Sequence, residues 1–165
     1  MSPALQRTRV DAGETAAVRP QGCTNLKLRQ LMRRVAQRYD AEVGKVGLKG
    51  TQYSLLSCVT KLGPIRPVDL AATMSIDAST LSRNLKPLID AGWVTLEAGA
   101  DARSRLVCAT DAGRDKRAEA QRRWRVAQEG VNAVLGPARV VALHALIDEA
   151  MGCLDELEEG EGGGA

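Results

Sequence analysis

The sequence is poor in aromatic residues. It contains no phenylalanine, two tyrosines and two tryptophans in 165 residues, although 44% of its residues are hydrophobic. A chain of this length is sufficient for one domain with its own core. The sequence therefore predicts a single globular domain whose core consists mainly of aliphatic side chains.

Closely spaced metal ligands are also lacking. The four cysteines are far apart, no Cys-x-x-Cys pair is present, and His144 is the sole histidine. A structural zinc site needs such ligands at short spacings, and disulfides are disfavoured in a reducing cytosol. We expect no metal, no cofactor, and free thiols at Cys23, Cys58, Cys108 and Cys153.

Long apolar runs do not occur either. The first residues lack the apolar run of roughly 7–15 residues that a secretory signal needs. No later segment approaches the ~20 apolar residues of a membrane-spanning helix. We expect a cytoplasmic protein that does not associate with membranes.

The excess of one charge sign is small. The chain has 23 basic and 20 acidic residues, which gives a formal net charge of +3. This charge allows nucleic-acid binding, but such binding would have to depend on local basic patches. No paired carboxylates, nucleophile–base set, phosphate-binding loop or metal-ligand cluster stands out in the sequence. We therefore expect that the protein is not an enzyme.

What the sequence does contain is a series of helical patterns around one hairpin. Residues 1–22 are polar and contain prolines, as expected for a mobile arm, and residues 158–165 have the composition of a flexible tail. Between them, apolar periodicity and capping residues predict a mainly α fold with a small β-hairpin. The predicted helices are 24–43, 52–62, 67–75, 78–91, 111–135 and 137–157, and the predicted strands are 93–97 and 105–109.

The last predicted helix is apolar on more than one face. Its hydrophobic residues are Val140, Val141, Leu143, Leu146, Ile147, Met151, Leu154 and Leu157. A helix of this kind needs more apolar partners than a small domain offers. We therefore expect a homodimer in which residues 24–50 and 111–157 form the dimerisation region, with His144 at the interface, while residues 51–110 form a separate lobe.

The segment 78–91 combines an apolar stripe with a polar, cationic face. Asp77 is a good N-cap, and Leu81, Leu85 and Leu88 recur at helical spacing. Pro87 interrupts this helix at a cost of about 3 kcal/mol, and we interpret it as a kink that lets the first half of the helix contact DNA while the second half stays packed.

The order of a short helix, a tight turn, a second helix and a hairpin is that of a winged helix-turn-helix, which predicts binding to double-stranded DNA. Arg83 suits guanine, Ser79 and Ser82 suit bases or phosphates, and Lys86 suits a phosphate. The basic residues of the hairpin, within the wing 97–105, suit an adjacent minor groove. The predicted DNA-binding residues are Ser79, Thr80, Ser82, Arg83, Lys86, Asp101, Arg103 and Arg105.

From residue 24 to 157 the sequence resembles the MarR family of bacterial transcriptional regulators. The matching segments are RRVAQRYD (33–40), GLKGTQYSLL (47–56), GPIRPVDLAATMSIDASTLSRNLKPLIDAGWV (63–94), DARSR (101–105) and TDAGR (110–114). The resemblance implies a dimer, interlocked through its first and last helices, that binds a near-palindromic operator. We expect it to be a repressor, although the sequence leaves activation open. The resemblance also implies that Asp101 braces Arg103. Ala109 departs from the family pattern, which usually has leucine there.

The same resemblance implies control by a small molecule bound beneath the first helix. The candidate ligand-binding residues are Asn25, Arg29, Met32, Tyr53, Ser57 and Trp93. A guanidinium, an amide, hydroxyls and flat rings suit an aromatic or indolic carboxylate or a phenolic compound. Trp124, on the long helix, is interpreted as a residue of the dimer interface.

Two other functions are compatible with the sequence. Some relatives of this kind sense hydroperoxides through a cysteine near the first helix, and Cys23 lies two residues before the matching position, which Asn25 occupies. A reactive thiol needs a lowered pKa, which nearby arginines could supply. The other alternative is a winged helix that docks proteins and does not bind DNA.

Overall fold

The computed structural model describes residues 21–99 and 104–162. Over these residues the chain is mainly helical with one antiparallel hairpin, which confirms the predicted fold class. The elements in order are α1 (Thr24–Val43), the 3₁₀ turn η1 (Gly44–Val46), α2 (Gly50–Leu62), α3 (Pro67–Thr73), α4 (Ala78–Asp90), β1 (Val94–Ala98), β2 (Arg105–Ala109), α5 (Asp111–Leu135) and α6 (Pro137–Gly162).

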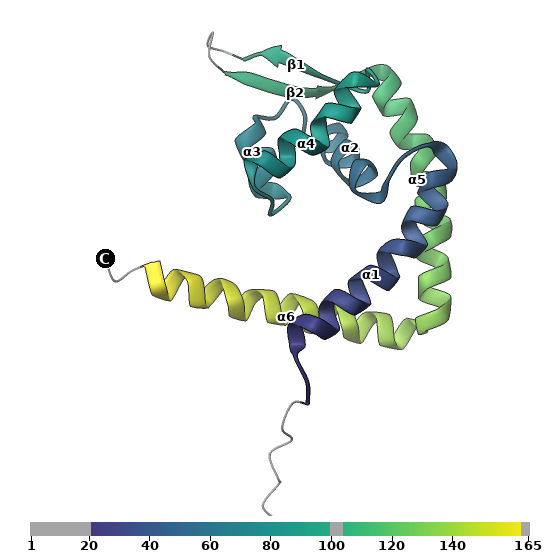
Figure 1. Cartoon of the computed structure of the whole chain (residues 1–165), viewed down its shortest axis with the longest axis vertical. Helices are drawn as coiled ribbons and strands as arrows, with labels where there is room; N and C mark the ends of the chain where they lie inside the picture. Colours follow the sequence, from purple (N-terminus) through teal and green to yellow (C-terminus); the bar gives the residue numbers. More distant parts are fainter. Residues whose placement is uncertain (1–20, 100–103, 163–165) are drawn as a thin grey trace, which may run out of the picture.

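The helices divide into a compact lobe and a long helical frame, which consists of α1, α5 and α6. Helices α2, α3 and α4 gather beneath the β1–β2 hairpin, and we call residues 50–110 the winged lobe (Figure 1). Helix α5 leaves this lobe, and α1 packs along it. Helix α6 then turns by 102° from α5 and extends away from the rest of the chain. The lobe and α6 therefore occupy opposite ends of the molecule, and α1 and α5 connect them.

The core of the winged lobe is mainly aliphatic, as predicted. Among the described residues, Tyr53 is the aromatic exception in the buried set. The largest fully buried side chains of the lobe are Leu55, Leu56, Val59, Leu70, Leu81, Leu88, Val94 and Val107, and Val43 at the end of α1 belongs to the same cluster. Because full burial of one such side chain contributes about 1.5–3 kcal/mol, the lobe has a core that can hold α4 in place.

Two predicted helix starts are confirmed by side-chain caps, and two glycines end helices as predicted. Asp77 accepts a hydrogen bond from the Thr80 N–H at the start of α4, and the Thr110 hydroxyl accepts one from the Gly113 N–H at the start of α5. Gly92 and Gly136, which follow α4 and α5, have left-handed φ angles of 71° and 83°, which glycine adopts without a steric penalty.

Several boundaries differ from the prediction. Helix α2 begins at Gly50, two residues early, because Gln52 Oε1 accepts from the Lys49 N–H at 2.8 Å and completes a cap there. Strand β1 begins one residue late, since the Trp93 N–H bonds to the Leu88 carbonyl. Helix α6 continues to Gly162, five residues beyond the predicted end.

Helix α4 continues through Pro87 without a break in its assigned range. Leu81, Leu85 and Leu88 are 2%, 5% and 0% exposed. Their combined burial contributes more than the roughly 3 kcal/mol that an interior proline costs. Tertiary packing therefore explains why the helix tolerates Pro87, whereas the predicted kink stays a prediction.

Helix α6 leaves much of its apolar surface uncovered. Its exposed large hydrophobic residues include Val141, Leu146, Ile147, Met151 and Leu154. No single helix in the described ranges has the length and hydropathy to cross a membrane; α5 and α6 meet these two criteria only when they are taken together across their 102° bend.

The start of α5 lies directly against the start of the hairpin. The Thr110 hydroxyl donates to the Gly92 carbonyl at 2.8 Å, and the Thr110 N–H donates to the Trp93 carbonyl at 3.1 Å. Gly113 is buried at this crossing, where an added Cβ would lie 2.0 Å from the Trp93 carbonyl oxygen. The close approach of helix and strand therefore requires glycine at this position.

We predict that Gly113→Ala lowers the free energy of unfolding by about 1–3 kcal/mol, because the backbone has to move to admit the methyl group. The matched control is Gly130→Ala on the same helix, where an added Cβ meets nothing within 4 Å. That change should raise the free energy of unfolding by up to about 1 kcal/mol through helix propensity. Urea denaturation of both variants measures the difference, and equal stabilities would contradict the close contact.

Candidate nucleic-acid interface

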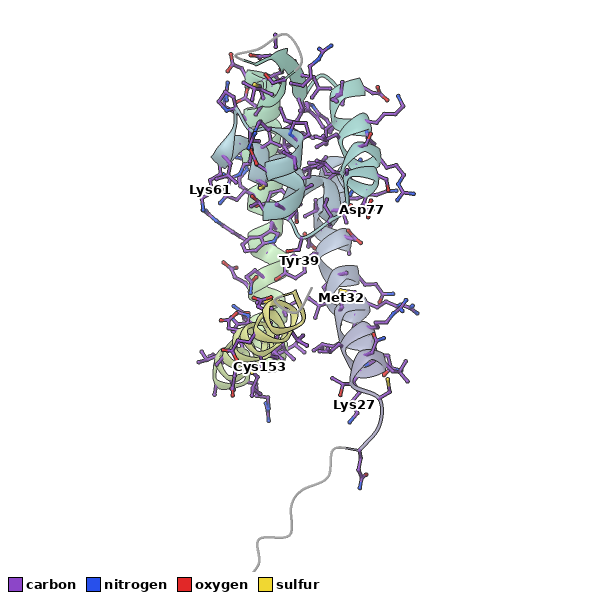
Figure 2. All side chains as sticks on the ribbon, turned by 90° about the vertical axis from the view of Figure 1, so that its left-hand side faces the viewer. Lys27, Met32, Tyr39, Lys61, Asp77 and Cys153 are labelled. Carbon is purple, nitrogen blue, oxygen red and sulfur yellow. The ribbon has the colours of Figure 1, made fainter. Side chains whose placement is uncertain are left out.

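The exposed face of α4 is polar and cationic. Ser79, Arg83 and Lys86 are all exposed, and at 3.6 residues per turn they lie along one line of the helix. Leu81, Leu85 and Leu88 fix the opposite side in the core of the lobe. Figure 2 shows Asp77, at the start of α4, in the lobe, well away from Lys27 and Met32 on the other half of the molecule. The packing thus presents this row of side chains to solvent.

Asp77 organises the first turn of α4. Its Oδ1 accepts from the Ser79 hydroxyl at 2.5 Å and from the Thr80 N–H at 2.8 Å, and its Oδ2 accepts from the Thr80 hydroxyl at 2.6 Å. The hydroxyls of Ser79 and Thr80, followed by the Thr80 N–H, hold the pKa of the Asp77 carboxyl far below its usual range. The carboxylate is therefore charged at neutral pH and acts as an acceptor only.

The two cations of α4 are held differently. Arg83 Nη2 donates to the Thr80 hydroxyl at 3.3 Å, while Lys86 Nζ forms an ion pair with Asp90 at 2.9 Å. Lys86 and Ser82 also border an apolar groove of about 800 Å³ between α3, α4 and β1. The structure thus joins Ser79, Thr80 and Arg83 into one network through Asp77 and places Ser82 and Lys86 on the neighbouring flank.

The hairpin contributes one described cation. Arg105 is exposed at the start of β2, where it pairs with Ala98 of β1. Asp101 and Arg103 lie outside the described residues, so the predicted brace between them stays a prediction. Ala109, which departs from the family pattern, is buried and pairs with Val94.

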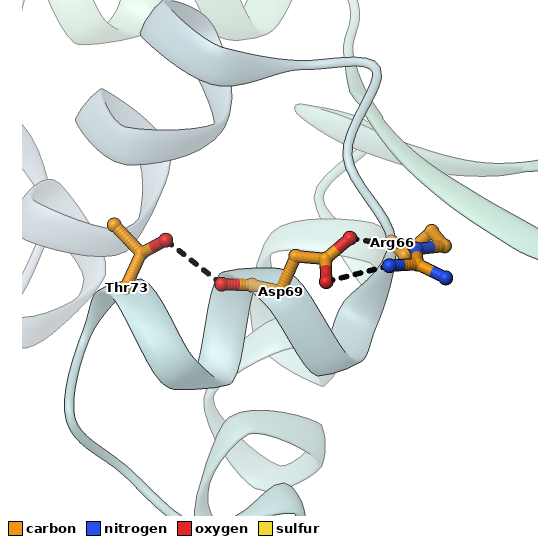
Figure 3. Close-up of polar contacts among 3 residues, drawn as sticks. All are labelled: Arg66, Asp69 and Thr73. Carbon is orange, nitrogen blue, oxygen red and sulfur yellow. Dashed lines mark hydrogen bonds and ion pairs between the residues drawn. The ribbon is translucent and has the colours of Figure 1, made fainter.

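Arg66 is a further exposed cation of the lobe that the sequence prediction missed. It precedes Pro67 at the start of α3, and its Nε and Nη2 donate to the two carboxylate oxygens of Asp69 at 2.6 and 2.9 Å (Figure 3). The Thr73 hydroxyl donates to the Asp69 carbonyl at 2.8 Å. The hydrogen bonds from Arg66 lower the pKa of the Asp69 carboxyl. The i,i+3 spacing of Arg66 and Asp69 was the signal for this oriented guanidinium.

Two of the six predicted ligand-binding residues line one cavity. Arg29 and Met32 of α1 border a space of about 450 Å³ between α1, α5 and α6. Polar groups from the other helices, those of Gln128, Asn132 and His144, also line it. Asn25 is exposed in the first turn of α1 and does not line this cavity.

The remaining three predicted ligand-binding residues lie elsewhere. Tyr53 is buried, with its ring centroid 6.3 Å from that of Trp124, and Ser57 lies one turn further along α2 with its hydroxyl buried. Trp93 lies beside α5, where Lys116 Nζ is 5.5 Å from the ring centroid. The structure therefore does not bring the six residues into one site.

Trp124 has contacts within its own chain, and its predicted place in the dimer interface stays a prediction. Its ring is half-buried and packs against Tyr39, at 5.9 Å between centroids, and against Tyr53 of the same chain. The Tyr39 hydroxyl donates to Gln128 Oε1 at 2.5 Å. These three rings join α1, α2 and α5, so Trp124 stabilises the connection between the lobe and the frame.

The four cysteines have distinct environments. All are free thiols; Cys23 and Cys153 are exposed, Cys58 is half-buried and Cys108 is buried. Burial raises the pKa of the Cys58 and Cys108 thiols, which makes them weaker nucleophiles. Cys23, at the N-cap of α1, is the accessible thiol nearest to the predicted redox position.

Comparison with known proteins identifies similar transcriptional regulators. Residues 46–104 match the profile of the MarR family. The uncharacterised HTH-type transcriptional regulator YwoH of Bacillus subtilis (strain 168) is 30% identical over 84 residues, which is 51% of this chain and 61% of YwoH. The matched region thus spans about three fifths of that relative.

Solved structures extend the similarity to most of the chain. The transcriptional regulator MosR of M. tuberculosis, solved in complex with DNA, is 31% identical with a TM-score of 0.67, over 80% of this chain and 98% of that one. A mutant of MarR from E. coli, solved with operator DNA, shares the fold with a TM-score of 0.71 at 19% identity, over 76% of this chain and 91% of that one.

Proposed function

Because the chain belongs to the MarR family of transcriptional regulators, we propose that it is a dimeric regulator that binds a pseudo-palindromic operator and acts as a repressor. The family consists of regulators, in agreement with the absence of any enzyme motif from the sequence. The observation that carries the proposal is the exposed row of Ser79, Arg83 and Lys86 on a helix whose other side is buried.

The geometry of α4 suits a major groove. A groove of this kind admits one helix and lets residues near its N-terminus contact base edges. Arg83 would bind guanine O6 and N7, and Lys86 would bind a phosphate after exchanging its exposed partner Asp90. Arg66 would donate to a phosphate beside α3, since its pairing with Asp69 fixes its orientation and a guanidinium has five N–H donors in all.

The hairpin would contact the neighbouring minor groove. Arg105 is exposed at its described end, and Arg103, braced by Asp101, would extend the contact from the tip. Narrow minor grooves attract arginine because their negative potential is enhanced.

The terminal helices supply the dimer interface. Apolar side chains are exposed on both of them, with Met32 of α1 67% exposed and Leu146 of α6 63% exposed. Burying these surfaces against a second copy removes a large apolar area from water. Two copies would then hold their α4 helices about one duplex turn, roughly 34–36 Å, apart.

A small aromatic carboxylate or phenolic compound, bound in the cavity at Arg29, would cause the protein to release the DNA. The exposed guanidinium of Arg29 can pair with a carboxylate, and Met32 and the neighbouring apolar residues can cover a ring. A ligand that prefers one dimer conformation about 100-fold supplies ~2.7 kcal/mol, which is within the usual range of allosteric coupling. Since the cavity joins α1, α5 and α6, its occupant would act on the helices that set the spacing of the two lobes.

Oxidation of Cys23 is the second candidate for control. The exposed position of this thiol at the start of α1 supports it. Oxidation there would change the same helix that lines the Arg29 cavity.

We predict that Arg83→Ala weakens binding to the preferred operator by about 10- to 100-fold, because one base-contacting arginine is worth roughly 1–3 kcal/mol. The control is Arg122→Ala, which removes the same charge from an exposed position on α5 and should change the affinity by less than about twofold. Fluorescence anisotropy across a salt series measures both, and the wild-type affinity should fall steeply with salt. Equal losses in the two variants would contradict the assigned face, and absence of binding at low salt would favour a protein-docking module.

We predict that Leu146→Glu converts the dimer to a monomer, because it places a charge in the proposed apolar interface. The control is Val68→Glu in α3, where valine is 65% exposed at the opposite end of the molecule. That variant should remain a dimer by sedimentation equilibrium. A Leu146→Glu variant that stays dimeric would place the interface elsewhere.

We predict that benzoate, phenylacetate or indole-3-acetate raises the melting temperature and releases the duplex. Arg29→Gln should reduce both effects, whereas Arg34→Gln, an exposed change outside the cavity lining, should not. Control would be assigned to oxidation instead if peroxide, but not these acids, released the duplex from the wild type and if peroxide no longer released it from Cys23→Ser.

A further inference from the structure

The first turn of α4 contains a carboxylate among its DNA-facing groups. An acid at this position repels phosphates, so its presence needs an explanation beyond charge balance. Capping alone needs one acceptor for the Thr80 N–H, yet Asp77 also binds the hydroxyls of both Ser79 and Thr80. These two contacts determine whether each hydroxyl can donate a hydrogen bond to a base or can only accept one.

The direction of these hydrogen bonds is fixed by chemistry. An ionised carboxylate has no proton to donate. Asp77 stays ionised because hydroxyl and backbone donors lower its pKa and because it lies at the positive end of α4. Each hydroxyl must therefore give its single proton to Asp77. Bonds to a charged acceptor are stronger than neutral ones, so this arrangement should persist against DNA.

Ser79 is consequently left with lone pairs alone on its outward side. The Thr80 oxygen is in a different position, because it also accepts from Arg83 Nη2 at 3.3 Å. Of the two hydroxyls, that of Ser79 is on the exposed row of α4, so it is the one that would face a groove in the proposed complex. It can accept a hydrogen bond there but cannot donate one.

We infer that Asp77 is a positioning residue that makes Ser79 an acceptor-only reader of the major groove, selecting the exocyclic amine of adenine or cytosine. Adenine N6 and cytosine N4 are the major-groove donors, whereas guanine and thymine present acceptors at the corresponding positions. Phosphate oxygens are acceptors too, so Ser79 cannot serve the backbone in this state. The inference rests on the proposed function and assigns Ser79 a specificity that an unconstrained serine does not have.

The test is binding-site selection from a randomised duplex pool with the full chain and three variants. Wild-type protein should select adenine or cytosine at one position of each half-site, with a discrimination of about 2- to 10-fold, as one hydrogen bond supplies. Ser79→Ala should lose the preference at that position alone. Ser54→Ala, which removes an exposed hydroxyl of α2 outside the predicted DNA-binding residues, should keep it.

The Asp77→Ser variant distinguishes the positioning role of Asp77 from its role as the N-cap of α4. Serine is also among the best N-cap residues, so the variant should melt close to the wild type, but it carries no charge and can reorient its own hydroxyl. With Ser79 free to donate, guanine and thymine should become acceptable at the same position. If Asp77 only caps the helix, the variant should lose affinity equally for all sequences and keep the base preference unchanged.

Three results would overturn the inference: an unchanged preference in Ser79→Ala, an unchanged preference in Asp77→Ser, or selection of guanine or thymine by the wild type at the position that Ser79 controls. If the wild type selects a defined operator while any of these holds, the inference fails and the proposed function stands. If the wild type binds no duplex at low salt, both fail.

Discussion

The burial of three leucines on one side of α4 is the constraint on which the rest of the structure depends. Leu81, Leu85 and Leu88 fix the rotation of the helix about its axis, and their side chains leave Ser79 and Arg83 no direction other than solvent. The same packing offsets the cost of Pro87. A surface that reads DNA has to be rigid before it can be specific, and in the proposed surface on α4 the rigidity comes from aliphatic packing beneath it.

Local signals were sufficient to predict most of the fold. The caps at Asp77 and Thr110 and the glycines at 92 and 136 act through neighbouring backbone groups, so the sequence carries them directly. The boundary of α2 was missed because Lys49 is not a usual cap and Gln52 completes it from the third position. Arg66 was missed although its partner lies only three residues away.

The ligand-binding prediction was less successful because it depended on packing between distant helices. Residues on a single helical line, such as Arg29 and Met32, share a cavity as expected. Tyr53 does not join them, since in a chain with so few aromatic residues it is used with Tyr39 and Trp124 to connect the lobe to α5. Which rings fill a core and which line a cavity is set by tertiary contacts, which sequence spacing does not encode.

We propose that α4 of the winged lobe reads DNA and that the terminal helices set the distance between two such helices, so that two copies bind one operator in register with the duplex. Sedimentation of the full chain with a selected duplex, repeated after insertion of about 5 base pairs between half-sites, tests it most directly. Half a helical turn moves one half-site to the opposite face. The account predicts two chains on the original duplex and a loss of this complex after insertion. One chain per duplex, or the same complex at both spacings, would contradict it.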